Sequence, residues 1–242
     1  MRGLIAICGV LAAWLFVTEL RLVAPLFLPS PRAVLFAYRP QLLDGAVAST
    51  ARALTGFFLG VGLGYILHFV CWSTGTIGFM DRNLAASRAI PAVAFMPLFI
   101  LWFGFGETGR VLVVVLTAMF FFVGPLTSAG QTLPREWSLL RQQLGVNALQ
   151  YYFLILFPAS LTSLIGPLRV TFSVCFTVAI ASDYMGAQSG IGKFIDTART
   201  TFNVPAVFLA IIVAAGIGVT VDVGLGAILN RVVHWKGRTA KA

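Results

Sequence analysis

The stretch PREWSLLRQQLGVNALQYYFLILFPASLTSLIGPLR, Pro134 to Arg169, is the one long polar interruption between otherwise near-continuous apolar segments. In its first half, apolar residues recur at steps of three and four among charges and amides: Trp137, Leu140 and Leu144. This spacing predicts a short amphipathic helix that lies at a surface and is too polar to span a bilayer. Gly145 then ends or bends the helix, and Pro158 forces a boundary or kink where apolar sequence resumes.

The composition around this stretch is that of a membrane protein. Of 242 residues, 59% are hydrophobic and 10% are charged, and the mean hydropathy is +0.93. Soluble domains carry roughly a quarter charged residues. The apolar runs suit helices of about 20 residues, whereas a β-barrel would have short alternating segments. The sequence therefore predicts an all-α integral membrane protein, with residues 1–242 forming a single transmembrane domain.

The formal net charge of +9 does not indicate nucleic-acid binding. The 17 Lys and Arg residues are scattered between apolar runs and form no dense patch, so a role near anionic lipid headgroups is expected. The cysteines lie in or beside apolar runs without metal-ligand spacing, which favours small core residues over a metal site. They are Cys8, Cys71 and Cys175.

Apolar runs predict six transmembrane helices, at about residues 3–20, 46–72, 84–103, 110–129, 158–183 and 205–233. The first run could imitate a signal peptide. It is long, however, and Thr18 to Arg21 offer no small-residue cleavage site, so we expect a retained span. Between the first two spans, Ser30 can cap and Pro31 can begin a short surface helix that ends near Ala37.

The second span contains three glycines at intervals of four: Gly56, Gly60 and Gly64. Glycines at this interval form one flat stripe on a helix, where the backbone of another helix can approach closely. Glycine as a spacer in any membrane helix would explain one or two of them, but not the full stripe. We therefore expect these glycines to form a helix-packing face.

The sequence offers no catalytic site of its own. Gly190 to Lys193 resemble part of a phosphate-binding loop, but Ala187 stands where its first glycine belongs and Phe194 where Ser or Thr must hold magnesium. The histidines, His68 and His234, are far apart and lack an acidic neighbour in sequence, which argues against a metal site or a catalytic triad. We therefore expect no cofactor bound by this chain.

The loop within Pro134 to Arg169 resembles a signature of ABC importer membrane subunits. Gly145, nine residues, Ile155, any residue, an apolar residue and Pro158 follow its spacing. In that family the loop forms a coupling helix that sits in a groove of the ATP-hydrolysing subunit. The family's Glu-Ala-Ala triplet is replaced by Leu139, Leu140 and Arg141. An ordinary interfacial helix between two spans is the alternative interpretation of the loop.

Further matches follow in family order, and together they resemble permeases of the nitrate, sulfonate and taurine importer class. They are Leu28-Pro-Ser-Pro31, Ser49-x-x-Arg52, the proline-flanked Pro91–Leu98, the Phe103-Gly-Phe-Gly-Glu107 turn, Asp183 and Gly190-Ile-Gly192. The resemblance implies a type I ABC importer permease fold with six spans and a cytoplasmic coupling helix, in the bacterial inner membrane. It also implies a second permease copy, two ATPase subunits that bind ATP and Mg²⁺, and an external substrate-binding protein.

The implied function is that of a permease subunit, not an enzyme, which forms the path for a small polar or anionic solute such as nitrate, a sulfonate or taurine. The loop residues implied in contact with the ATPase are Arg135, Glu136, Leu139, Leu140, Arg141, Leu144, Gly145 and Val146. A channel or a non-catalytic membrane scaffold is the alternative. Neither of these needs a partner ATPase, so co-purification of an ATP-binding chain discriminates between them.

Polar groups and prolines at membrane depth mark the expected pathway between two permease copies, because they are tolerated mainly along a cavity or a protein interface. The candidate residues are Pro91, Phe95, Met96, Pro97, Thr177, Ser182 and Asp183. Asp183 would lie at the external mouth as a gate or structural partner, or would simply cap its span in water. Arg169 is expected to snorkel to the interface or to pair with a polar group there.

The expected orientation places both termini in the cytoplasm. With the coupling loop inside, nine basic residues are cytoplasmic and seven external, a small bias under the positive-inside rule. The orientation therefore depends more on the coupling-loop resemblance and on the basic C-terminal tail.

Overall fold

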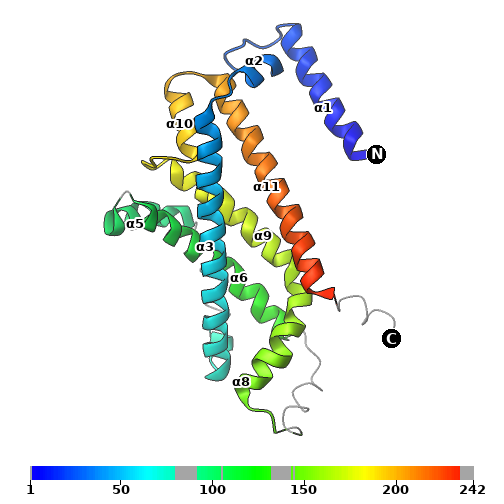
Figure 1. Cartoon of the computed structure of the whole chain (residues 1–242), viewed down its shortest axis with the longest axis vertical. Coiled ribbons are helices and arrows are strands. Elements are labelled where there is room, and N and C mark those ends of the chain that lie inside the picture. The colour runs from blue at the N-terminus through cyan, green and yellow to red at the C-terminus, as the bar shows by residue number, and fades with distance from the viewer. Residues whose placement is uncertain (1, 80–91, 105, 132–142, 144, 235–242) are drawn as a thin grey trace.

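The described part of the chain, in a computed structural model, is helical and comprises residues 2–79, 92–104, 106–131, 143 and 145–234. Within it, four helical segments are long and apolar enough to cross a membrane. They are α3 (Pro40–Ser73), α6 (Glu107–Gln131), the continuous segment from α8 (Ala148–Tyr151) through α9 (Phe157–Asp183), and α11 (Val204–Val232). Figure 1 shows them as an elongated bundle with α8 at the bottom and α10 (Ile191–Thr200) near the top.

The other two expected spans are not among these four. Helix α1 (Arg2–Glu19) lies at the edge of the bundle in Figure 1 and contacts α11 through Trp14, whose ring centroid lies 6.1 Å from that of Phe208. Residues 92–103 form a single 3₁₀ turn and the eight-residue helix α5 (Met96–Phe103), while residues 80–91, including Pro91, lie outside the described residues. The expected surface helix is α2 (Pro31–Phe36), and its cap is as predicted, because the Ala33 N–H donates to Ser30 Oγ at 3.3 Å.

The glycines of α3 lie against α6. A Cβ added to Gly56 would come 2.5 Å from the Val114 side chain, and one added to Gly60 would overlap Ala118. One turn further, a Cβ on Gly64 would come 3.2 Å from Phe122. Glycine thus lets α3 and α6 approach more closely than any side chain would allow. Together with α9 these two helices enclose the apolar core.

Helix α9 does not begin at Pro158. The helical path starts at Ala148 and passes through a π-helical turn, Tyr152–Leu156, before continuing into α9. Proline lacks an N–H and its ring clashes with the carbonyl four residues earlier, which here is that of Leu154. The wider π turn surrounds that carbonyl. The kink expected at Pro158 therefore takes the form of a π-helical turn within a continuous segment.

Candidate functional site

A buried polar cluster joins α3, α6, α9 and α10 at the α10 end of the bundle. Arg52 of α3 forms an ion pair with Asp183, the last residue of α9. Its other edge donates to Glu107, with Nε–Oε2 at 2.7 Å and Nη2–Oε1 at 3.0 Å. Asp183 is 0% exposed and also accepts a hydrogen bond from Ser49 Oγ at 2.6 Å. One guanidinium thus ties α3 to both α6 and α9.

The loop between α9 and α10 closes over Asp183. The Gly192 N–H donates to the Asp183 carboxylate at 3.3 Å, and the Ile191 N–H donates to Ser49 Oγ at 2.8 Å. Gly190 has φ +143°, and a Cβ added there would overlap the Asp183 carboxyl group. Glycine is therefore required at position 190, both for its backbone conformation and for the close approach.

Arg110 completes the polar cluster. It is 1% exposed and donates to the backbone carbonyls of Gly106 and Met185, each at 3.3 Å. Its Nη1 lies 3.6 Å from Glu107, and its Nε has no hydrogen-bond partner among the described residues. With two guanidinium and two carboxylate groups, the polar cluster is formally neutral. This geometry fits the interpretation of Asp183 as a structural partner.

Helix α9 presents a small and polar face to the outside of the chain. Residues at steps of three and four are exposed along it: Ser163, Gly166, Val170, Ser173 and Thr177, here called the α9 stripe. The hydroxyl groups of Ser173 and Thr177 donate to carbonyls one turn earlier, at 3.2 and 3.0 Å. By contrast, the outward residues of α3 are large and apolar, among them Val47, Phe58 and Ile66. Of these two helices, α3 has the face expected of a helix in contact with lipid.

An ion pair borders the α9 stripe. Arg169 Nε donates to Asp222 Oδ1 of α11 at 2.8 Å, and Arg169 Nη2 pairs with Oδ2. The two side chains keep 40% and 29% of their surface exposed. Of the two expected behaviours of Arg169, the structure therefore has pairing with a polar group.

At the α8 end of the bundle, an aromatic clasp fastens the exit of the loop to α3. It comprises His68, Phe69, Trp72, Tyr151 and Tyr152. Tyr151 stacks on Trp72, with ring centroids 5.9 Å apart. The hydroxyl of Tyr152 lies 2.8 Å from His68 Nδ1 and 3.4 Å from the Tyr65 carbonyl. If Tyr152 donates to that carbonyl, His68 Nδ1–H donates to Tyr152, and its buried Nε2 is left as an unprotonated lone pair.

The loop exit itself has a defined shape. Gly145 has φ +63°, and Asn147 begins α8 with a capping box, since the Gln150 N–H donates to Asn147 Oδ1 at 2.8 Å and the Gln150 side chain accepts from the Asn147 N–H at 3.2 Å. Val146 is half-buried against the aromatic clasp. The remaining residues expected to contact an ATPase lie outside the described residues: Arg135, Glu136, Leu139, Leu140, Arg141 and Leu144.

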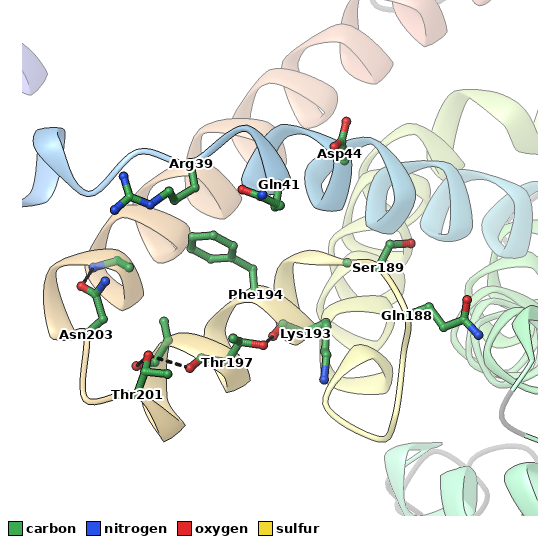
Figure 2. Close-up of a pocket in the computed structure, with 13 residues that line it drawn as sticks. Arg39, Gln41, Asp44, Gln188, Ser189, Lys193, Phe194, Thr197, Thr201 and Asn203 are labelled. Carbon is green, nitrogen blue, oxygen red and sulfur yellow. Dashed lines mark hydrogen bonds between the residues drawn. The ribbon is translucent and has the colours of Figure 1, made fainter.

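A pocket of about 620 Å³ opens at the α10 end, between the start of α3, α10 and the start of α11. Figure 2 shows the Phe194 side chain directed toward the start of α3, with the polar side chains of the pocket around it. Its lining carries both signs of charge: Arg39, Asp44 and Lys193. In this pocket, polar groups of the chain remain open to the outside.

The residues expected along a pathway are dispersed. Met96, Ser182 and Asp183 are each 0% exposed, because they pack within this chain's own core or polar cluster. Phe95 is half-buried, and Pro97 and Thr177 are exposed. Sequence reasoning placed Thr177 on a pathway but missed the stripe around it, although the step of three and four between Gly166, Ser173 and their neighbours was available as a signal.

Comparison with known proteins places the chain in a family. The sequence pattern of the binding-protein-dependent transport system inner membrane component matches residues 56–234, more than half of the chain. The putative aliphatic sulfonates transport permease protein SsuC of Bacillus subtilis is 28% identical, over 98% of this chain and 88% of the relative. The taurine transport system permease protein TauC of Escherichia coli is 28% identical, over 94% and 86%.

Other matches broaden this picture. The riboflavin transport system permease protein RibX of Chloroflexus aurantiacus is 34% identical, over 63% of this chain and 57% of the relative. A chain of the inward-facing MetNI methionine ABC transporter shares the fold, with a TM-score of 0.62, 17% identity, and coverage of 81% of this chain and 96% of that one. The chain belongs to the binding-protein-dependent transport system inner membrane component family and is a permease subunit of an ABC importer.

Proposed function

We propose that the α9 stripe lines the translocation path of this permease, at an interface with a second permease copy. The carrying observation is the contrast between helices. Along α9 the outward residues are small or polar except for Val170, and include Gly166, Ser173 and Thr177, whereas the outward face of α3 is dominated by large apolar residues. At membrane depth, polar groups are tolerated mainly where they face protein or water. The substrate class that fits the named sulfonate and taurine relatives is a small anionic or zwitterionic sulfonate.

The α8 end is proposed as the cytoplasmic end, where residues 135–146 bind one of two ATPase subunits. Support comes from the sharp exit at Gly145 and from the capped, clasped start of the following helix, which together give the loop a rigid attachment to the spans. The α10 end is then external, and its charged pocket would face the binding protein that delivers the solute. In this assembly α1 and the segment around α5 complete six spans, with both termini in the cytoplasm.

Reconstitution tests the pathway directly. In proteoliposomes that contain the permease, its ATPase and its binding protein, Ser173→Cys and Thr177→Cys are expected to react with a membrane-impermeant thiol reagent, at rates that change when ATP is added. Cys8 and Cys71 would be replaced by serine, whereas Cys175 is 0% exposed. Phe58→Cys, near the middle of the apolar face of α3, is the matched control and should not react. Labelling of Phe58→Cys alone would contradict the assignment of the two faces.

Coupling is tested at Gly145. Valine there is strained by the positive φ, although no described atom would crowd its Cβ. Gly145→Val should therefore leave ATP hydrolysis in place while uptake falls. Gly75, at the turn after α3, also has a positive φ, +71°, and open surroundings. Gly75→Val thus imposes the same kind of strain outside the coupling segment, and equal loss of uptake in both variants would argue against this role for Gly145.

A further inference from the structure

The ion pair between Arg169 and Asp222 lies inside two membrane spans. Arg169 precedes Asp183 by 14 residues in α9, which is about 21 Å of helix. Asp222 lies 18 residues into α11 from Val204, about 27 Å from its start. Charges at such positions are costly in hydrocarbon, and they mark a functional site unless the chain buries them. Here the chain buries neither completely, since 40% and 29% of the two side chains remain exposed.

The pair sits at the border between packed and open surface. On α9, the neighbouring positions Leu168 and Phe172 are buried in the core, whereas Val170 and Ser173 belong to the exposed α9 stripe. The Ser173 hydroxyl donates to the Arg169 carbonyl, one turn away. A solute that moves along the stripe would therefore pass the outward edge of the guanidinium.

Asp222 uses only part of that guanidinium. The Arg169 Nε and Nη2 atoms bond the two carboxylate oxygens, and within the described ranges no side chain or carbonyl accepts from Nη1. A guanidinium carries five N–H donors in a plane, so three remain for another acceptor. Gly226 gives the group room on α11, because a Cβ added there would come 3.3 Å from Arg169 Nε.

We infer that the outward edge of Arg169 is a transit site for the oxyanion group of the solute, a sulfonate or a similar oxyanion. Planar donors of this kind match the oxygens of such groups. Asp222 fixes the guanidinium and offsets its charge, so binding is weak enough for release, as conduction requires. The inference rests on the proposed pathway along α9 and names what that pathway recognises.

The test measures charge selectivity at a reporter beside Arg169. Ser173→Cys, in the background without Cys8 and Cys71, is labelled with an anionic sulfonate-bearing thiosulfonate reagent and with a cationic quaternary-ammonium one. Replacement of Arg169 by glutamine should lower the anionic-to-cationic ratio of labelling rates about fivefold, the order expected for one charge at this range. Asp222→Asn should raise the ratio. Ethanesulfonate should slow labelling more than chloride at equal ionic strength, and only with Arg169 present.

The double variant Arg169→Gln with Asp222→Asn leaves no buried charge unpaired, so it covers the case in which Arg169→Gln alone does not fold. Because the double variant removes one charge of each sign, its decisive measurement is the protection by ethanesulfonate, which should be lost. An unchanged ratio in folded Arg169→Gln, or protection that persists in the folded double variant, overturns the transit site but leaves the pathway standing. Absence of labelling by either reagent overturns both, since the α9 stripe would then not reach water.

Discussion

Single residues at the α10 end show how charges can be kept within a membrane protein. Asp183 accepts from Ser49 and from the Gly192 N–H, and it pairs with Arg52, which also holds Glu107. Each member therefore meets a partner from a different element. Such an arrangement contributes little net stability compared with apolar packing, but Arg52 and Asp183 are buried, so the removal of either leaves the other poorly compensated. The role that follows is to fix where the ends of α3, α6 and α9 meet.

Asp183→Ala is accordingly expected to destabilise the chain by about 3–5 kcal/mol, because buried Arg52 would lose its buried carboxylate and keep only the largely exposed Glu107. Thermal unfolding of the detergent-solubilised protein measures the change. Asp196→Ala provides the comparison, since Asp196 pairs with Arg199 one turn away on the surface of α10, with N–O at 2.9 Å. Loss of that pair should cost less than about 1 kcal/mol. Equal effects of the two substitutions would contradict a buried clamp at Asp183.

Sequence reasoning recognised most of these residues but not their contacts. The Ser49–Arg52 match and Asp183 were each identified, yet 131 positions separate Arg52 from Asp183, and no periodicity connects them. Likewise, Arg169 was expected to find a polar partner, while Asp222 could not be named as that partner. Pairing across helices depends on the rotation of each helix about its axis, which packing sets and a local pattern does not contain.

Among the elements, α3 and α6 form the closest pair, and the glycines decide how close. Gly60→Leu is expected to destabilise the bundle by at least about 1–3 kcal/mol, because its side chain would overlap Ala118 and the Val115 carbonyl. Gly62 is the matched position, on the same helix with open space around it. Gly62→Leu should insert into the membrane normally and unfold at the same temperature as the wild type. If Gly60→Leu did the same in a thermal unfolding assay, α3 and α6 would not pack as described.

The π turn and the aromatic clasp make a second element-level junction. Tyr152→Phe removes the hydroxyl that lies 2.8 Å from His68 Nδ1, so an unsatisfied buried group should cost about 1–3 kcal/mol. Tyr65→Phe removes a hydroxyl of the same cluster that is buried without a hydrogen-bond partner among the described residues, and it should be neutral or stabilising. Hydrogen exchange of the amides at 148–156 should accelerate only in Tyr152→Phe. Acceleration in both variants, or in neither, would count against the hydrogen bond.

Elements were predicted where composition alone decides them. The long apolar runs and the cap at Ser30 indicated α2, α3, α6, α9 and α11 within three residues at their ends, except that α3 begins six residues before the expected start. The π turn was not predicted, since Pro158 specifies that the helix must deviate but not how. Helix α10 was also missed. The signal for it was available, because the buried residues Ile191, Ile195 and Ala198 recur at steps of four and three, the pattern of an amphipathic helix.

At the scale of the whole molecule, α3 and the segment from α8 through α9 are fastened to each other twice. His68 holds Tyr152 at the α8 end, and Arg52 holds Asp183 at the α10 end, 16 residues or about 24 Å away along α3. A displacement of the loop before Gly145 would therefore move α3 and α9 together. Between the two attachments lies the α9 stripe, so this motion would be transmitted to the proposed path.

This transmission requires the two ends to lie on opposite sides of the membrane, which gives the last prediction. Ser189→Cys lies in the exposed lining of the pocket at the α10 end, and Thr74→Cys lies in the exposed turn after α3 at the α8 end. The variants are made in a permease without Cys8 and Cys71. In intact cells, a membrane-impermeant maleimide should label Ser189→Cys at once and Thr74→Cys only after lysis. Cys175 should not be labelled before or after lysis, because it is 0% exposed. The reverse order of labelling would invert the proposed orientation and remove the ATPase from the α8 end.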